Sequence, residues 1–429
     1  MNNTITNKNT SLSNSLLLGN RWVQLAIGVM CMALVANLQY GWTLFVEPIA
    51  DRHHWSLESI QFAFTIFGFA STWLVPIQGW FSDRFGPRPV VFVSGIFTAL
   101  GWILNAHADS LGMLYFAGII SGLGSGGVYG TCLGCALKWF PDNRGLAAGL
   151  AAAGFGAGGT LFVVPITHMI QNSSYEHAFI FFGLLQGIGV IILSFLLLTP
   201  EPQATELNKV EVETSRVDYS MKQMLKTPVF WVIYIIYVAA AAGGVVATAE
   251  LATIARNYDV AATPITLFGL TLPVLAMALS IDNIANGFSR PVCGFISDKI
   301  GRENTMFVVF IGQGLALLGL MHFGHSPLTF VICAALLFMF WGEIFSLFPA
   351  TCGDTFGSKY ASGNAAVLYT AKGTAGLVVP LASYVAATQS WDHILLPLAI
   401  IAICAGIAAK LILAPMRHRF IAAAQKQAA

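Results

Sequence analysis

The stretch GWFSDRFGPRPVVF, Gly79–Phe92, has a counterpart in GFISDKIGRENTMF, Gly294–Phe307. Each copy follows an apolar run and places an aspartate and a basic residue ahead of a glycine, close to the pattern G-x-x-[SD]-D-[RK]-x-G-x-R. The two copies occupy corresponding places in the first and second halves of the chain. An internal repeat in this phase predicts two parallel structural halves.

The composition indicates a membrane protein. The chain has 429 residues, of which 56% are hydrophobic and 10% are charged, whereas soluble domains carry about 25% charged residues. Apolar runs of about 20 residues, each long enough to cross a bilayer as a helix, recur along its whole length. We therefore predict an all-α membrane protein with twelve transmembrane helices in two pseudo-symmetric six-helix bundles. The predicted spans are 22–47, 57–80, 88–107, 111–138, 145–170, 177–199, 227–254, 266–296, 303–324, 326–350, 360–388 and 391–414.

The longest polar segment between spans, residues 200–226, is the predicted linker between the bundles. Cations concentrate in this linker, in the other loops that follow even-numbered spans, and in the two tails. By the positive-inside rule both termini are then cytoplasmic, and we expect the chain in a bacterial cytoplasmic (inner) membrane. The predicted parts are a cytoplasmic tail 1–21, a first bundle 22–199, the cytoplasmic linker, a second bundle 227–414 and a cytoplasmic tail 415–429.

The loop SDRFGPR after the second span resembles the signature loop of the major facilitator superfamily, and the resemblance covers essentially the whole chain. In that superfamily the acidic and basic groups of this loop lock neighbouring helix ends on the cytoplasmic side. The alternative reading is ordinary interfacial charge that caps helix ends. The resemblance implies a cytoplasmic gate made of Asp83, Arg84, Arg88, Asp298 and Arg302.

Small residues recur in RGLAAGLAAAGFGAGG, Arg144–Gly159. Gly145 and Gly149, and then Gly154 and Gly158, stand four residues apart. Such spacing lets helix backbones approach closely within a membrane. We predict close helix contacts along this segment.

Two cations, Arg290 and Lys372, lie near the middle of predicted spans. A cation at the bilayer centre costs about 2.5–3.5 kcal/mol even on the lenient insertion scale. Arginine offers a planar fork that grips a carboxylate through two hydrogen bonds, whereas lysine offers a compact point charge. Together the two cations suit a small carboxylate anion.

The alternative is that buried acids neutralise these cations, and Glu250, Asp282 and Glu343 are the candidates. Asp282 precedes Arg290 by eight residues, a separation of about 12 Å along a helix that is too long for a direct bridge. Glu343 follows Trp341 by two residues and would face away from a cavity that Trp341 lines. Asp282 and Glu343 are therefore candidates for coupling or charge compensation.

Aromatic and amide side chains near the middle of their spans are candidates for the walls of a cavity. Trp341 and Phe345 are four residues apart, and Tyr369 and Lys372 are three apart, so each pair shares a helix face. Any one of these aromatics alone is also compatible with core packing. The candidate wall residues are Gln39, Tyr40, Gln61, Tyr129, Trp341, Phe345 and Tyr369.

Five motifs make the chain similar to the oxalate/formate antiporter family: LGNRW, QYGWTLF, WFPDNRGLAAGL, RPVCGFISDKIGR and AAVLYTAKGTAG. The resemblance implies that Arg290 and Lys372 bind the substrate carboxylates. It also implies that Gln39, Tyr40, Gln61, Tyr129 and Trp341 line the pocket. The family pattern differs at four places, with tyrosine in place of Phe345, tryptophan in place of Tyr369, and no acid at Asp282 or Glu343.

These observations predict a secondary active transporter of small carboxylates that works by alternating access, with oxalate:formate-type exchange as the expected reaction. One alternative is a proton-coupled symporter of a monocarboxylate such as lactate, pyruvate or formate. A second alternative is a carboxylate sensor that moves nothing. The sequence shows no nucleophile–base pair or metal-ligand cluster, so we expect no enzyme activity, no cofactor and no metal. The expected partners are small carboxylate anions and membrane lipid, without nucleic acid, for a protein that functions as a monomer.

Overall fold

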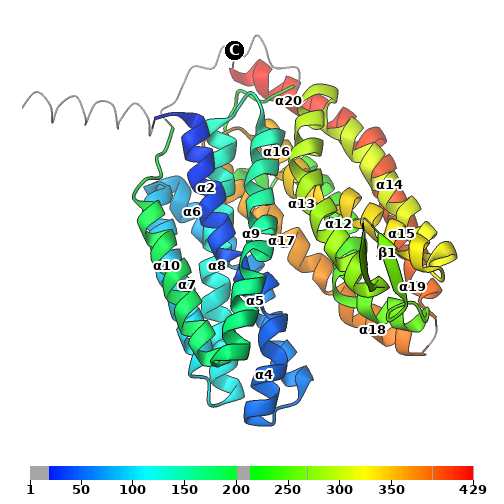
Figure 1. Ribbon diagram of the computed structural model, residues 1–429. Coiled ribbons are helices and arrows are strands. Elements are labelled where there is room, and N and C mark those ends of the chain that lie inside the picture. Colours follow the sequence, from blue (N-terminus) through cyan, green and yellow to red (C-terminus); the bar gives the residue numbers. More distant parts are fainter. Residues whose placement is uncertain (1–18, 201–212, 268, 389, 429) are drawn as a thin grey trace, which may run out of the picture. The chain divides into compact units, whose positions relative to one another are not determined.

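The computed structural model describes residues 19–200, 213–267, 269–388 and 390–428 (Figure 1). The predicted tail up to residue 18 and residues 201–212 of the predicted linker lie outside the described residues. The chain divides into two compact units. Unit 1 comprises Met1–Asp142, Leu150–Lys209 and Ser358–Val367, and unit 2 comprises Asn143–Gly149, Val210–Gly357 and Leu368–Ala429.

Unit 1 is built from helices around an aromatic core. Helix α8 packs against α2, α5 and α7, and α10 packs against α7. At the centre, the Phe45 and Phe179 rings stack with centroids 3.9 Å apart, and Trp102 meets both rings edge-on. The helices are α2 (Arg21–Val35), α3 (Asn37–Tyr40), α4 (Thr43–His53), α5 (Leu57–Trp73), α6 (Val75–Phe85), α7 (Pro87–Ala106), α8 (Leu111–Trp139), α9 (Arg144–Asn172, whose start belongs to unit 2) and α10 (Tyr175–Ser194).

Unit 2 is also helical and carries one short hairpin. Helix α13 packs against α15, and α14 packs against α15 and α19. The elements are α11 (Met221–Met224), α12 (Pro228–Asn257), β1 (Pro264–Leu267), β2 (Leu270–Pro273), α13 (Val274–Ile300), α14 (Arg302–Phe323), α15 (Pro327–Gly342), α16 (Ile344–Phe356), α17 (Ala361–Gly376, whose start belongs to unit 1), α18 (Val378–Thr388), α19 (Asp392–Ala408), the π-helix η2 (Ala409–Leu413) and α20 (Ala414–Ala428).

The prediction that the eighth span begins at residue 266 was wrong. Strands β1 and β2 pair antiparallel there, with Pro264 opposite Pro273 and Leu267 opposite Leu270. Gly269 closes the turn with φ of 80°, a conformation that favours glycine. Helix α13 begins only at Val274, directly after Pro273, because proline suits the start of a helix and disrupts its interior.

The first predicted span is interrupted. Helix α2 ends at Val35, the short α3 follows, and a turn at Gly41 and Trp42 separates α3 from α4, although the Gly41 N–H still donates to the Asn37 carbonyl at 2.9 Å. The break lies beside Gln39 and Tyr40, two of the predicted pocket residues. Irregular backbone inside a membrane protein is tolerated where protein or a water-filled cavity surrounds it.

Eleven helices among the described residues are long and apolar enough to cross a membrane. Helix α13 is not one of them, although its 27 residues make it long enough. It carries Asp282, Asn283, Asn286 and Arg290 in its middle, and these polar side chains lower its hydropathy. The long helix missing from this set is therefore the one that holds the predicted binding arginine.

The glycines of α9 make the predicted close contacts. A Cβ at Gly158 would lie 2.2 Å from the Ala33 carbonyl oxygen of α2. A Cβ at Gly149 would lie 2.3 Å from the Arg290 carbonyl oxygen of α13. Real Cβ atoms do not approach so closely, so these backbones touch only because glycine has no side chain.

Candidate functional site

Arg290 is almost completely buried on α13, with 2% of its surface exposed. Its Nε and Nη2 atoms both donate hydrogen bonds to Oδ1 of Asn286, one turn earlier, at 3.0 and 2.8 Å. Pro291 follows directly inside the helix and cannot donate to the carbonyl of Gly287. The guanidinium therefore lies in a polar part of α13, with its orientation fixed by an amide.

Phe345 on α16 brings the two predicted binding cations together. Its ring centroid lies 4.6 Å from Cζ of Arg290 and 5.4 Å from Nζ of Lys372. Both distances are within the range of a cation–π interaction, which is stronger where water is excluded. Phe345 itself is buried. Two positive groups on α13 and α17 thus share one neutral aromatic ring inside unit 2.

Tyr369 and Trp341 complete this cluster, which we call the cation cluster: Arg290, Trp341, Phe345, Tyr369 and Lys372. The Tyr369 hydroxyl accepts a hydrogen bond from Lys372 Nζ at 3.3 Å. The Trp341 ring meets Phe345 edge-on with centroids 5.4 Å apart, and its Nε1 donates to the Ala241 carbonyl at 3.2 Å. The two pairs predicted from sequence spacing are in contact, Tyr369 with Lys372 on α17 and Trp341 with Phe345 across the junction between α15 and α16.

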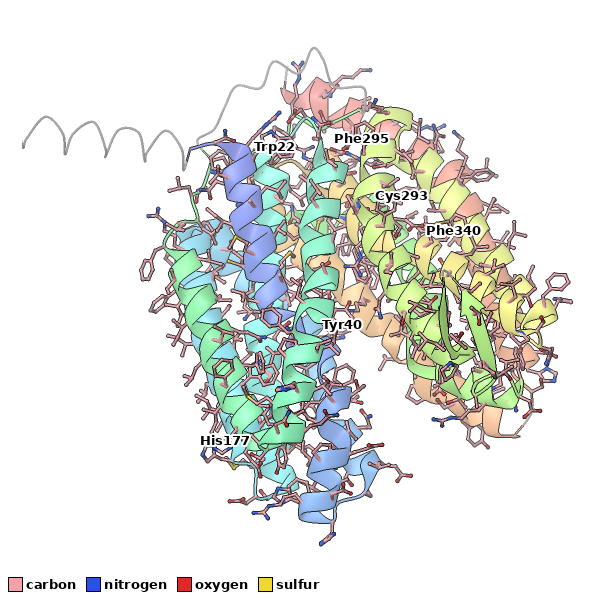
Figure 2. All side chains as sticks on the ribbon, in the orientation of Figure 1. Trp22, Tyr40, His177, Cys293, Phe295 and Phe340 are labelled. Atoms are coloured by element: carbon pink, nitrogen blue, oxygen red, sulfur yellow. The ribbon has the colours of Figure 1, made fainter. Side chains whose placement is uncertain are left out.

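The other four predicted pocket residues belong to unit 1. Tyr40 and Tyr129 both meet Phe155 of α9 edge-on, with centroids 5.6 and 5.4 Å from it. Figure 2 draws the side chains on the ribbon and labels Tyr40. Gln39 is half-buried beside Tyr40 on α3, and Gln61 is exposed on α5. Unit 1 therefore brings the two tyrosines together around one ring.

Two acids, Asp282 and Glu343, are buried without hydrogen bonds to their carboxylate oxygens. Glu343 lies between α15 and α16, is completely buried, and interacts electrostatically with Arg290 and Cys293 of α13. The prediction that Asp282 makes no direct bridge to Arg290 is confirmed, because its oxygens accept no hydrogen bond. The third candidate, Glu250, accepts a 2.5 Å hydrogen bond from the Ser383 hydroxyl.

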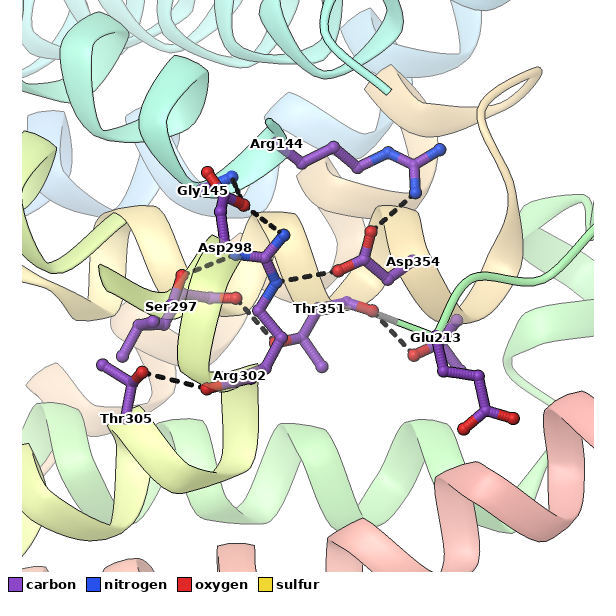
Figure 3. A network of polar contacts seen from close by, with 12 residues as sticks. Arg144, Gly145, Glu213, Ser297, Asp298, Arg302, Thr305, Thr351 and Asp354 are labelled. Atoms are coloured by element: carbon purple, nitrogen blue, oxygen red, sulfur yellow. Dashed lines mark hydrogen bonds and ion pairs between the residues drawn. The ribbon is translucent and has the colours of Figure 1, made fainter. Parts of the chain in front are cut away.

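The second copy of the repeat forms a buried network at the start of α9 (Figure 3). Asp298 accepts hydrogen bonds from the backbone N–H groups of Gly145 and Leu146 at 2.9 and 2.8 Å. The same carboxylate pairs with Arg302 at 2.6 Å. Negative charge is favourable at a helix N-terminus because several backbone donors there lack helical partners.

Asp354, at the end of α16, extends the network. Its Oδ2 accepts from Arg302 Nε at 2.8 Å, and its Oδ1 accepts from Arg144 Nη1 at 2.6 Å (Figure 3). All three side chains are at most 5% exposed. One carboxylate therefore bridges two buried arginines, and Asp298, which also pairs with Arg302, supplies the second negative charge.

The first copy of the repeat makes an equivalent arrangement in unit 1. Asp83, which corresponds to Asp298, accepts from the backbone N–H groups of Ser362 and Gly363 at 3.2 and 2.7 Å, in the first turn of α17. Its ion pair is with Lys138 at 2.7 Å. In both copies a buried aspartate caps a helix and pairs with a cation.

Arg84 and Arg88 make other contacts. Arg84 is exposed and stands over the Trp80 and Phe85 rings, 5.3 and 5.5 Å from their centroids. Arg88 is exposed and donates from Nε to the Leu197 carbonyl at 2.6 Å. Of the five predicted gate residues, Asp83, Asp298 and Arg302 are thus the ones in the two aspartate networks.

Sequence reasoning missed Lys138, Arg144 and Asp354 as members of these networks. Lys138 and Asp354 carried a signal in the sequence, because each is a single charge at the end of a long apolar run. Arg144 carried a different one, because it directly precedes Gly145 at the start of a helix. Which charges pair could not be read from the sequence, since Arg144 and Asp354 are 210 positions apart.

Comparison with known proteins gives matches along most of the chain. The Major Facilitator Superfamily profile matches residues 25–380 and 260–427. The oxalate:formate antiporter of Oxalobacter formigenes is 35% identical over 379 residues, which cover 88% of this chain and 86% of the antiporter. Monocarboxylate transporter 13 of Bos taurus is 36% identical over 135 residues, which cover 31% of this chain and 30% of that transporter.

Solved structures show the same fold at low sequence identity. The proton:xylose symporter superposes with a TM-score of 0.68 at 13% identity, covering 92% of this chain and 96% of that one. The fucose:proton symporter of E. coli superposes with a TM-score of 0.66 at 14% identity, covering 91% of this chain and 98% of that one.

Proposed function

The chain belongs to the major facilitator superfamily, and we propose that it exchanges small carboxylate anions across a bacterial cytoplasmic membrane, with oxalate against formate as the leading pair. The membership confirms the predicted family and fold class, and it makes the chain a transporter and not an enzyme. The cation cluster is the observation that carries the proposal. Its two cations contact the same Phe345 ring inside unit 2.

The chemistry of the cation cluster suits a dicarboxylate. Since Arg290 and Lys372 both contact one ring, the gap between their charges cannot exceed the two contact distances combined. A dianion of oxalate size presents one carboxylate to each cation, and Arg290 can donate two parallel hydrogen bonds. Tyr369 and Trp341 supply a neutral wall beside the cations. A relative described as an oxalate:formate antiporter supports the same substrate class.

Exchange follows from the charge of the empty site. Two cations in a closed, dry cavity oppose the conformational change, because their desolvation is not repaid. A bound dianion cancels both charges and removes that penalty. The loaded carrier therefore changes between its outward-open and inward-open states, whereas the empty carrier does not. If the carrier returns with a monoanion bound, one positive charge of the site remains uncancelled. Each cycle of dianion-for-monoanion exchange then moves net charge across the membrane. The proposed carrier works as a monomer in lipid, with both termini cytoplasmic.

The aspartate networks are the proposed cytoplasmic gate. For the site to open to the cytoplasm, the helix ends that Asp83 and Asp298 cap must separate from them. The carboxylates accept four backbone hydrogen bonds in all, and each also has an ion pair. Closing restores these bonds, which gives the proposed closed state a defined geometry.

Counterflow in proteoliposomes tests the transport proposal. Purified protein is reconstituted with unlabelled oxalate inside, and uptake of labelled oxalate is followed with formate, lactate, malonate and succinate as competitors. Lys372→Gln should abolish oxalate exchange, whereas Lys359→Gln, which removes an exposed lysine over Tyr360, should leave it unchanged. Wild-type exchange by the Lys372 variant would refute the binding role, and no oxalate exchange by the wild type would refute the substrate.

A second candidate function is proton-coupled symport of a monocarboxylate, and the buried acids favour it. Asp282 and Glu343 have no hydrogen-bond donor to stabilise a charge, and an ionised carboxylate buried in this way is costly. Such an acid can bind a proton in one conformation and release it in another. The partial likeness to a monocarboxylate transporter concerns the same substrate class.

The two functions predict different responses to a pH gradient. With no counter-substrate inside, a symporter accumulates monocarboxylate when the gradient is imposed, and an exchanger does not. Glu343→Gln and Asp282→Asn should remove gradient-driven uptake if these acids carry the proton. Glu250→Gln is the matched control, since the Glu250 carboxylate, unlike those of Asp282 and Glu343, accepts a hydrogen bond from the Ser383 hydroxyl.

A further inference from the structure

Asn286 holds the guanidinium of Arg290 by one edge. A single oxygen, Oδ1, accepts from Nε and Nη2 at 3.0 and 2.8 Å. Arginine has only donors, so the atom that faces it must be the amide oxygen and not the nitrogen. Two hydrogen bonds to one acceptor fix the plane of the guanidinium, which its long side chain would otherwise leave free to rotate.

The surroundings fit this arrangement closely. Gly342 of α15 lies against Asn286, where a Cβ would come within 2.7 Å of the Asn286 carbonyl oxygen and 2.8 Å of Oδ1. The Phe345 ring lies 4.6 Å from Cζ of Arg290. Asn286 and Phe345 thus both contact the guanidinium, and the missing side chain at Gly342 leaves room for the amide.

The neutral partner distinguishes Arg290 from other buried arginines. Four arginines among the described residues are buried, namely Arg144, Arg290, Arg302 and Arg417. Arg144 and Arg302 pair with Asp354, and Arg417 pairs with Glu303. Arg290 instead directs two donors at the Asn286 amide, while the buried Glu343 carboxylate interacts with it electrostatically without a hydrogen bond. A carboxylate at position 286 would accept the same two hydrogen bonds but would also cancel the charge.

We propose that Asn286 is the positioning residue of the anion site: its amide orients the Arg290 guanidinium, and its neutrality leaves the positive charge for the substrate. The inference rests on the proposed binding role of Arg290 and deepens it. Because the amide carries no charge, it does not cancel the charge of the guanidinium, and the proposed exchange depends on that positive charge. Asn286 therefore sets both substrate affinity and the coupling of inward to outward movement.

Two substitutions separate orientation from charge. Asn286→Leu removes the acceptor at similar size, so the guanidinium loses its fixed plane and KM for oxalate should rise about tenfold. Asn286→Asp keeps the acceptor and adds a negative charge, so exchange should fall at least about tenfold. In the same variant, efflux into medium without substrate should rise relative to exchange, because the empty site is neutralised. A purely structural role for Asn286 would not produce this gain of uncoupled efflux.

Matched variants control for position and folding. Asn283→Asp places the same charge one turn earlier on α13, where Asn283 is exposed and donates to the Leu279 carbonyl, and it should behave as the wild type. Gly342→Ala adds a Cβ within 2.6 Å of the Ser289 hydroxyl and 2.7–2.8 Å of the Asn286 oxygens, so it displaces the Asn286 amide without changing it and should also raise KM. If the aspartate variant does not fold, as judged by size exclusion and thermal unfolding, the leucine and Gly342 variants decide the inference by their KM values.

The outcomes distinguish this inference from the function on which it rests. If Arg290→Gln exchanges oxalate like the wild type, the binding role of Arg290 falls and the inference falls with it. If Arg290→Gln is inactive while both Asn286 variants keep wild-type KM and exchange, only the inference is overturned. Equal loss of exchange in the leucine and aspartate variants, without uncoupled efflux, would also overturn it.

Discussion

Arg144 and Asp354 lie 210 positions apart in the sequence and form an ion pair of 2.6 Å between Nη1 and Oδ1. Both side chains are at most 5% exposed. The second oxygen of Asp354 accepts from Arg302, which in turn pairs with Asp298. The start of α9 is therefore joined to the ends of α13 and α16 through buried charges that depend on each other.

Asp354→Asn should destabilise the protein strongly. The amide cannot neutralise Arg144 and Arg302, and removing one partner of a buried ion pair costs about 3–5 kcal/mol. The measurement is thermal unfolding of the purified protein in detergent. Asp142→Asn is the control, because the Arg21–Asp142 pair is 41% and 33% exposed and exposed pairs contribute about 0–1 kcal/mol. Equal shifts in the two variants would contradict the role given to Asp354.

Asp83→Asn should loosen the first turn of α17. The substitution removes the ion pair with Lys138 and weakens the two backbone hydrogen bonds from Ser362 and Gly363. Cys135 of α8 is 7% exposed and lies within electrostatic range of Asp83 and Lys138. Its alkylation, mapped by peptide mass spectrometry, should become about tenfold faster. That factor corresponds to a decrease of about 1.4 kcal/mol in the free energy needed to expose the thiol.

The control for Asp83→Asn is Arg84→Gln, a neighbouring change at an exposed residue that stands over Trp80 and Phe85. Its Cys135 alkylation should match the wild type. A gate in which Arg84 takes part would show faster alkylation in both variants. No change in the Asp83 variant would remove the gating role of that aspartate.

Phe345→Leu should weaken substrate binding without unfolding the bundle. Leucine keeps the apolar volume approximately but removes the π face that Arg290 and Lys372 share. Each cation–π contact contributes about 0.5–2 kcal/mol, so KM for oxalate should rise about tenfold. Phe345→Tyr keeps the aromatic ring and adds a hydroxyl donor. This variant should have a lower ratio of the KM for oxalate to the KM for formate than the wild type. A leucine variant with wild-type KM would show that the ring is only packing.

Much of the fold can be predicted from hydropathy. The two predictions that failed, the start of the eighth span and the continuity of the first, have local causes. The apolar run from 266 to 273 reads as the start of a span, because hydropathy does not distinguish a strand from a helix. Pro264, Gly269 and Pro273 carried the missing information, since they favour a turn between short strands over a helix interior. The break after α2 was likewise not predicted, although Asn37, Gln39 and Gly41 interrupt the apolar segment there.

The candidate site was predicted in part, for a related reason. Arg290 and Lys372 stand out because charge in an apolar run is costly. Asn286 drew no attention, because a single uncharged asparagine in a helix is unremarkable until its side chain is seen to face Arg290. The partner of Arg144 could not be predicted, since no local pattern connects positions so far apart.

Gly244→Ala should displace Trp341 from the cation cluster. A Cβ at Gly244 of α12 would lie 2.1–2.3 Å from three atoms of the indole ring, so the ring must move and its hydrogen bond to Ala241 is lost. Inserting a methyl group into a filled space of this kind lowers the free energy of unfolding by about 1–3 kcal/mol. Gly68→Ala is the matched control, because apart from its chain neighbours and the backbone of its own helix nothing lies within 4 Å of the added methyl group, and alanine in a helix interior is favoured over glycine by about 0.5–1 kcal/mol. We expect a lower unfolding temperature and a higher oxalate KM for Gly244→Ala, and an unchanged KM for Gly68→Ala. A Gly244 variant that loses stability but keeps wild-type KM would assign Trp341 to packing and not to the pocket wall.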